Sequence, residues 1–375
     1  MKSIKKEEIG FLDYFEEIED PRKPGGNTRH MACEILLITL CAILCGADSW
    51  RDLVEYGHLK LEFLQKFFPY KYGVPSKNTF YRFFAALKPE VFKDCFLSWI
   101  RTLELVDEDV IAIDGKTIRR SFDKTNEKKP IHVVSAFASK SGLVLGQEKV
   151  TEKSNEIKAI PQLLDLLDIR GSIITIDAMG TQKEIAKYII DNGGDYILAL
   201  KGNHSILHKE VAEFMQDKSN LKNFYQVEDV DCGHGRIETR ECIATEAISW
   251  LGKLKFPGQK SVFAINSTRE IKGKATKETR YFISSLPADP VKLNTATRLH
   301  WSVENQLHWV LDMTFNEDYS RIRLDNAAEN ISMVRHTALN LLKLAKSKFK
   351  KDTSLKGLRK MAGWDNNTLS IILKQ

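Results

Sequence analysis

The sequence lacks the cysteine patterns of exported and zinc-stabilised proteins. Its 375 residues contain six cysteines, and no two of them form a CxxC pair. The spacing of Cys232, His234 and Cys242 fits no common zinc site. Four of the six lie in apolar, helix-like surroundings, so we expect reduced cysteines of the kind found inside cytosolic proteins.

Long hydrophobic runs, internal repeats and low-complexity segments are also missing. The opening residues MKSIKKEEIGFLDYF have no apolar stretch typical of a signal peptide, and the most apolar run, 35–47, is too short to span a bilayer. We therefore expect no membrane partner and a cytoplasmic location. The net charge of +6 is modest, so it permits a nucleic-acid partner without requiring one.

Residues 1–104 have the apolar periodicity of helices and predict an all-helical N-terminal domain. Within it, PSKNTFYRFFAAL resembles the second helix of a helix-turn-helix motif, with Lys77, Arg82 and Lys88 placed to contact phosphates. A plain helical bundle without DNA contacts fits the same pattern, and both interpretations stay open.

From about residue 106 the pattern changes to short apolar runs that alternate with helical ones. Three strands, a helix, a strand, a helix and a strand are predicted at 110–114, 132–138, 143–150, 155–167, 172–177, 181–191 and 196–200. This order is typical of an α/β protein with a mixed sheet covered on both faces, and it fits the ribonuclease H-like fold in particular.

The chain is therefore expected to have three parts: a helical domain 1–104, an α/β domain 105–345 and a basic C-terminal tail 346–375. The α/β domain includes a longer segment, about 201–294, with strand-like pieces. It then continues into a helix that we place at 298–323.

Three acidic residues point to phosphodiester chemistry. Asp114 and Asp177 each end a buried strand, which places both at the rim of the sheet, where ligands bind. Glu304 lies in the predicted helix 298–323, on one face with His300 and His308. Carboxylate oxygens suit Mg²⁺, and two ions about 3.5–4 Å apart can activate a water or 3′-hydroxyl and stabilise the leaving oxygen.

Other interpretations of these residues remain. A single strand-terminal Asp is more often a helix cap or a solvated side chain, and Asp312, Glu317 and Asp318 are rival carboxylates near Glu304. His308 is a candidate for a further metal ligand, although imidazole suits Mg²⁺ poorly.

Long motifs along almost the entire chain resemble DDE transposases of bacterial insertion sequences. The resemblance is to the H-repeat-associated branch, which is found alongside Rhs elements. The most specific motifs are IAIDGKTIRRS from Ile111, ITIDAMGTQKEIA from Ile174, GHGRIETR from Gly233 and HWSVENQLHWVLDMTFNEDYSRIR from His300.

The resemblance implies a helical N-terminal domain, a ribonuclease H-like core with a β-rich insertion, and the acidic triad Asp114, Asp177 and Glu304. It implies a transposase that uses two Mg²⁺ or Mn²⁺ ions to join terminal inverted repeats of double-stranded DNA to target DNA. A homodimer on the DNA and nucleoid association in a bacterial cytoplasm are also implied. Two alternatives stay open: a nuclease of this fold without strand transfer, and an inactive DNA-binding relic or domesticated regulator.

The chain departs from related transposases around the Glu, where they carry a Tyr, an Arg and a Lys at fixed spacings. The matching positions here are Thr297, His300 and Leu311. The resemblance therefore implies no particular route of end processing, through a hairpin or otherwise.

Basic and aromatic residues near the acids are candidates for DNA contacts, with solvated side chains as the alternative. Trp301 can stack on an unpaired base, whereas we expect Trp309 to pack in the core. Arg236 and Arg240 alternate in a predicted strand and should point the same way. The candidates are Lys116, Arg119, Arg120, Lys201, Asn203, Arg236, Arg240, His300 and Trp301.

Overall fold

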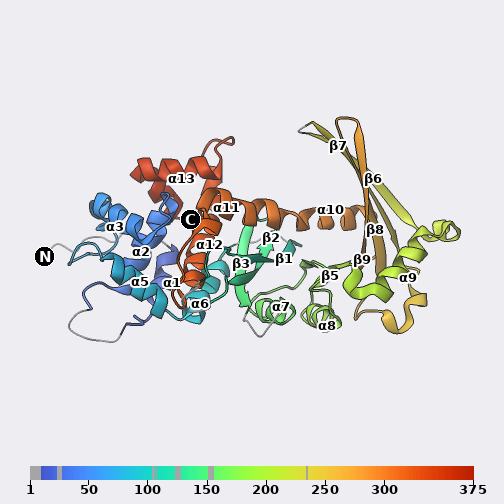
Figure 1. The fold of residues 1–375 in the computed structure, drawn as a ribbon, viewed down its shortest axis with the longest axis horizontal. Coiled ribbons are helices and arrows are strands. Elements are labelled where there is room, and N and C mark those ends of the chain that lie inside the picture. The colour runs from blue at the N-terminus through green and yellow to red at the C-terminus, as the bar shows by residue number, and fades with distance from the viewer. Residues whose placement is uncertain are drawn as a thin grey trace.

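The structure, a computed structural model, describes residues 10–22, 28–103, 106, 108–122, 128–150, 156–233 and 235–375. His234 lies outside these residues. Along its long axis the molecule has a helical bundle, a central sheet with helices on both faces, and a four-stranded arm (Figure 1). None of the helices in the described parts of the chain has the length and apolar character that a membrane crossing requires.

The N-terminal bundle confirms the prediction of an all-helical region. Its centre is the second helix, whose sequence ACEILLITLCAIL is buried at nearly every position. The side chains of Ser49 and Ser76 cap the helices that follow them. The bundle consists of α1 (Gly10–Glu16), α2 (Ala32–Leu44), α3 (Trp50–Leu59), α4 (Leu61–Leu64), α5 (Lys77–Ala86) and α6 (Pro89–Ile100).

The C-terminal helices complete this bundle. Helix α12 (Ala327–Ala345) packs against α2, α5 and α6 on one side and against the third strand of the sheet on the other. Residues beyond it were expected to form a basic tail, but they fold into α13 (Leu355–Trp364) and α14 (Asn366–Leu373), which pack on α12. The buried side chains of Leu358 and Leu369 account for this packing.

The central sheet has the strand order and directions of the ribonuclease H-like fold, as predicted. Strand β1 is antiparallel to β2 and parallel to β4, and the order is β3-β2-β1-β4-β5. Helices α7 and α8 cover one face (Figure 1). The elements are β1 (Val110–Thr117), β2 (His132–Ala138), β3 (Leu143–Val150), α7 (Glu156–Asp165), β4 (Ile173–Ile176), α8 (Lys183–Asp191) and β5 (Asp195–Leu200).

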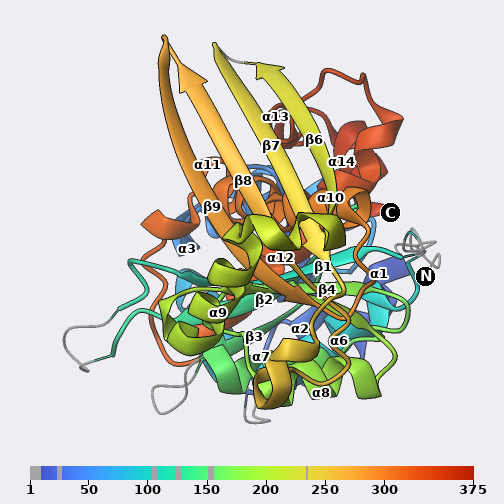
Figure 2. The ribbon, with the colours of Figure 1, turned by 90° about the vertical axis from the view of Figure 1, so that its right-hand side faces the viewer.

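Four antiparallel strands extend the sheet into an arm that rises away from the body (Figure 2). The arm consists of β6 (Tyr225–Gly233), β7 (Arg236–Thr245), β8 (Ser261–Ile271) and β9 (Lys274–Ser284), and β9 pairs with β5. Helix α9 (Ser205–Gln216) packs on one face of its base. Helix α10 (Pro290–His300) packs on the other, through Leu293 and Ala296 against Phe263 and Phe282.

The helical segment that carries Glu304 differs from the predicted span 298–323. It begins with α10, passes through a π-helical turn, Glu304–His308, and ends with α11 (Trp309–Phe315). Asn316, in the left-handed region at φ 51°, terminates it, and a short 3₁₀ turn, Glu317–Tyr319, follows. Val303 and Leu307 are fully buried and anchor this segment to the core.

Candidate active site

The parallel pairing of β1 and β4 brings two acids to one rim. Ile113 lies opposite Ile176, and Asp114 and Asp177 are the residues that follow them. Asp177 comes directly after the end of β4, as predicted. Asp114 does not end its strand as expected, because β1 continues to Thr117 through its pairing with β2. One carboxylate oxygen of Asp177 accepts hydrogen bonds from the backbone N–H groups of Met179 (3.0 Å) and Gly180 (3.2 Å). This turn fixes Asp177 at the end of its strand, as the sequence predicts.

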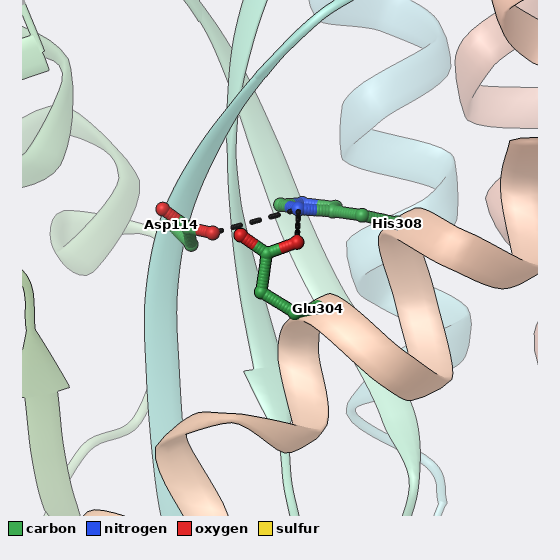
Figure 3. Close-up of side chains that lie close together, drawn as sticks. All are labelled: Asp114, Glu304 and His308. Carbon is green, nitrogen blue, oxygen red and sulfur yellow. Dashed lines mark ion pairs between the residues drawn. The ribbon is translucent and has the colours of Figure 1, made fainter. Parts of the chain in front are cut away.

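The π-helical turn places Glu304 and His308 over Asp114 (Figure 3). Nδ1 of His308 lies 3.5 Å from Oδ2 of Asp114 and 3.7 Å from Oε2 of Glu304. One ligand atom from each residue lies within 4.8 Å of the other two, and across the described residues this is the group that could hold a metal ion. π-Helical turns occur often at functional sites.

Burial and charge shape the ionisation of this cluster. Burial raises the pKa of Asp114 to about 6; the imidazole of His308 opposes this rise, and the charge of Glu304 adds to it. The His308 ring facing Glu304 lowers the pKa of that carboxyl. The two carboxylates lie close together, with Asp114 partly buried and Glu304 exposed, and a divalent cation would supply the counter-charge that this pair needs.

A pocket of about 340 Å³ contains all three predicted acids; we call it the carboxylate pocket. It is lined by Asp114, Asp177, Glu304, Thr175, Lys201 and His300. Its oxygen-rich donors fit Mg²⁺ or Mn²⁺.

Nδ1 of His308 faces the acids, whereas its Nε2 is buried and has no hydrogen-bond partner within the described residues.

A second, larger hollow adjoins the carboxylate pocket, between α10 and the inner face of the arm. This arm groove has a volume of about 820 Å³. It shares Glu278, Arg280 and Trp301 with the carboxylate pocket, so the two are continuous. Its basic and aromatic lining consists of Arg236, Arg240, Arg269, Lys277, Arg280, Arg298 and Trp301.

Three predicted contact residues, Arg236, Arg240 and Trp301, line the arm groove. Arg236 and Arg240 point the same way into the groove, although Arg240 is mostly buried and its Nε donates to Asn294 Oδ1 (3.4 Å). Trp301 is 41% exposed. Trp309, expected in the core, is 60% exposed instead, because α11 turns that side of the helix to solvent.

Two predicted contacts are occupied by other interactions. Lys116 is not free for a phosphate, because its Nζ lies 2.6 Å from Asp312 Oδ1 and 2.8 Å from Glu317 Oε2. These contacts also direct two of the rival carboxylates, Asp312 and Glu317, away from the carboxylate pocket. Burial lowers the pKa of His300 to about 4, and Nδ1 of His300 shares a hydrogen bond of 2.9 Å with the Thr175 hydroxyl, so this ring is neutral at pH 7.

The remaining predicted contacts lie at the edges of the site. Lys201 is exposed at the pocket mouth. The Asn203 amide donates to the carbonyl of Ala178 (2.5 Å), which supports the turn after Asp177. Arg119 and Arg120 are exposed, with Arg119 paired to Asp318 (3.1 Å) and Arg120 lying over the Tyr319 ring.

The sequence interpretation missed Arg269, Arg280 and Arg298 of the arm groove. Arg269 lies opposite Glu238 in the β7–β8 ladder, and Arg280 lies opposite Ile265, so only the strand register places them on the groove face. The available signal was the alternation of charged residues in the strands, which by itself does not identify the face.

Comparison with protein families gives two matches that together span most of the chain. Residues 12–100 match the family described as DDE_Tnp_1-associated. Residues 106–341 match the family described as Transposase DDE domain.

Curated relatives agree with these matches. The chain is 43% identical to "Putative transposase YncI" of Escherichia coli O157:H7 over 341 residues, covering 88% of this chain and 87% of that protein. It is 42% identical to "H repeat-associated putative transposase YhhI" of E. coli K12 over 370 residues, covering 96% and 97%. Among solved structures, a piggyBac transposase synaptic complex with hairpin DNA is a distant likeness, with a TM-score of 0.46 and 12% identity over 98% of this chain and 77% of that one.

Proposed function

Because the chain belongs to the DDE transposase family, we propose that it is an insertion-sequence transposase that binds terminal inverted repeats of double-stranded DNA. It cleaves this DNA with a divalent metal and joins it to target DNA. The observation that carries the proposal is the gathering of Asp114, Asp177 and Glu304, from three distant parts of the chain, in one pocket continuous with an arginine-lined groove.

The chemistry is divided between the acids and the residues that support them. Asp114, Asp177 and Glu304 would hold two Mg²⁺ or Mn²⁺ ions, which would supply activation of a water or 3′-hydroxyl and stabilisation of the leaving oxygen. The turn at Met179 keeps Asp177 in place. Nδ1 of His308 lies close to both of the other carboxylates and holds them toward one another.

The DNA surface consists of the arm groove and the mouth of the carboxylate pocket. Arg236, Arg269 and Arg280 contact phosphates, and Trp301 stacks on an unpaired base at the cleaved end. Lys201 extends this surface at the pocket mouth. Two copies bring the two ends of an element together, so a homodimer forms on the DNA.

A strand-transfer assay tests the proposal. The protein is incubated with labelled DNA that contains the inverted repeats flanking the reading frame, a target plasmid and Mg²⁺ or Mn²⁺. We expect joined products that require metal, and we expect Asp114→Asn and Glu304→Gln to abolish them while DNA binding persists. Cleavage without joining would support the nuclease alternative, and sequence-specific binding without cleavage would support an inactive relic or regulator.

A further inference from the structure

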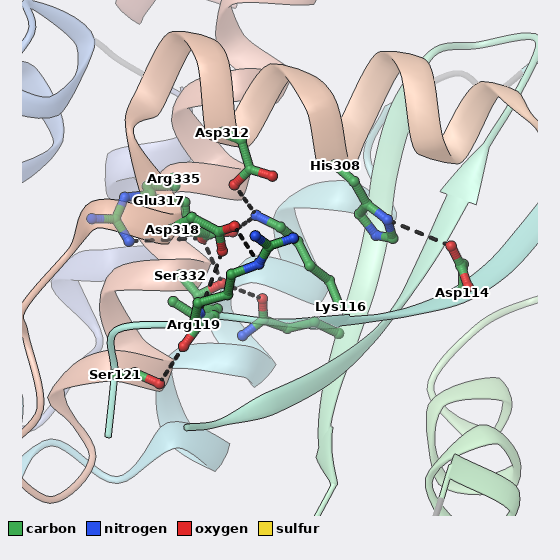
Figure 4. Close-up of polar contacts among 12 residues, drawn as sticks. Asp114, Lys116, Arg119, Ser121, His308, Asp312, Glu317, Asp318, Ser332 and Arg335 are labelled. Carbon is green, nitrogen blue, oxygen red and sulfur yellow. Dashed lines mark hydrogen bonds and ion pairs between the residues drawn. The ribbon is translucent and has the colours of Figure 1, made fainter. Parts of the chain in front are cut away.

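Asp114 and Lys116 leave β1 on the same face, because they are two residues apart in a strand. Both face the helical segment that carries Glu304. Asp114 lies close to Glu304 and His308. Two residues further along the strand, Lys116 forms an ion pair with Asp312 (Figure 4). The strand and the helix therefore touch at two places: the proposed metal site and the Lys116 ion pairs.

The ion pairs of Lys116 extend into the interior of the protein. The Lys116 side chain is 12% exposed and that of Glu317 is 1% exposed. The second oxygen of Glu317 accepts a hydrogen bond from the Ser332 hydroxyl (3.2 Å) and lies 3.7 Å from Nη1 of Arg335 on α12. Lys116 thus links β1 to α11, to the 3₁₀ turn at Glu317 and, through Glu317, to α12.

Buried ion pairs of this kind contribute little net stability, because removing the charges from water costs about as much as their attraction returns. Their main consequence is a fixed geometry. The carboxylates of Asp114 and Glu304 repel each other, which favours separation of β1 from the helix. The attraction between Lys116 and Asp312, eight residues after Glu304, opposes that separation.

We infer that Lys116, through Asp312 and Glu317, is a positioning residue that sets the distance between Asp114 and Glu304. This role replaces the phosphate contact predicted for Lys116 from the sequence. The inference rests on the proposed function, since the distance matters because these two acids hold metal.

Binding of Mn²⁺ alone, followed by its paramagnetic resonance signal, tests this role in the full-length chain. We expect Lys116→Met to weaken Mn²⁺ binding by about 10- to 100-fold, the range found when groups that orient metal ligands are removed. The matched control is Lys93→Met, because Lys93 also forms a shielded ion pair, 2.7 Å from Glu148, between α6 and β3. This control should lose comparable thermal stability and keep the Mn²⁺ affinity of the original protein.

Each outcome decides between roles. Unchanged Mn²⁺ affinity in Lys116→Met, or an equal loss in Lys93→Met, would overturn the positioning role. A flattening of the salt dependence of DNA binding by about one unit in Lys116→Met would restore the phosphate contact instead.

If Lys116→Met does not fold, Asp312→Asn removes one of the two ion pairs of Lys116 and should weaken Mn²⁺ binding by a smaller factor. If the unaltered protein does not bind Mn²⁺, both the inference and the proposed metal site are overturned. If the unaltered protein carries out strand transfer and the Lys116 and Asp312 variants keep its Mn²⁺ affinity, only the inference is overturned.

Discussion

The guanidinium carbon of Arg280 lies 4.9 Å from the centre of the Trp301 ring, where the arm groove meets the carboxylate pocket. Arg280 comes from β9 in the arm, and Trp301 lies three residues before Glu304. The pair therefore joins the strands of the arm to the helical segment that carries Glu304. Under the proposed function, a DNA strand that leaves the pocket for the groove passes directly over it.

Substitution of this pair should weaken DNA binding in a coupled way. Trp301→Ala removes a stacking surface for a base, worth about 1–3 kcal/mol, and Arg280→Ala removes a phosphate contact and a cation–π partner worth about 0.5–1 kcal/mol. Because each side chain orients the other, the double variant should lose less than the sum of the single losses. Fluorescence anisotropy with DNA that has an unpaired end measures the binding of the two single variants and the double variant. The control is Arg170→Ala, because Arg170 is an exposed arginine paired to Asp168. If the loss of the double variant equals the sum of the two single losses, Arg280 and Trp301 bind DNA independently and neither orients the other.

Two substitutions of Asp177 should separate its effect on cleavage from its effect on the stability of the fold. Asp177→Asn keeps an oxygen that can accept from the N–H groups of Met179 and Gly180, so its unfolding free energy should stay close to that of the original protein. Asp177→Ala loses both hydrogen bonds and should be less stable by about 1–2 kcal/mol. Both should abolish metal-dependent cleavage. Urea unfolding together with the cleavage assay checks this, and persistent cleavage by Asp177→Asn would remove Asp177 from the triad.

Local sequence patterns predicted the central sheet well, because each of its strands is a short apolar run between turns. The arm was harder. All residues of β6 are exposed or half-buried, since it is the outer edge of the sheet, so it has no apolar run to detect. The helices α13 and α14 were missed for another reason: the lysines around α13 suggested a solvated tail, although Leu358 and Leu369 are buried against the rest of the bundle.

Local patterns predicted where two of the three candidate acids lie in the fold, but not their surroundings. A strand end located Asp177 and a helical face located Glu304, whereas Asp114 lies within β1, whose continuation to Thr117 the apolar run did not indicate. The burial of Lys116 depends on Glu317, about 200 residues later, and no local pattern encodes that distance. Residue type alone therefore assigned Lys116 to phosphate, and only the packing of β1 against the helix corrects it.

His300 should contribute no positive charge to DNA binding at neutral pH. Its pKa is lowered to about 4 by burial, so the ring gains a proton only below that pH. His300→Gln should therefore leave the salt dependence of DNA binding at pH 7 unchanged. Arg236→Ala, which removes an exposed groove cation, should flatten the slope by about one unit. Binding titrations at several salt concentrations distinguish the two, and an equal flattening in His300→Gln would mean that the bound ring is charged.

The Glu317 carboxylate should make stability depend on pH in a predictable direction. Burial alone would raise its pKa, but Lys116 and then Arg335 outweigh this and hold the pKa at about 2, below its ordinary value of 4.5. Because the folded state binds this proton more weakly than the unfolded state, the stabilisation is fully present above pH 4.5 and is lost as the pH falls toward 2.

Glu317→Gln should accordingly be less stable than the original protein at pH 7, because it leaves Lys116 and Arg335 buried with one fewer negative charge. The difference should shrink steadily as the pH is lowered from 4.5 toward 3. Urea unfolding across this range measures it, with Glu213→Gln as control, because Glu213 forms an exposed ion pair with Lys209 and should show only a small difference throughout. A difference for Glu317→Gln that stays constant from pH 7 to pH 3 would show that packing, rather than charge, holds Glu317 in place.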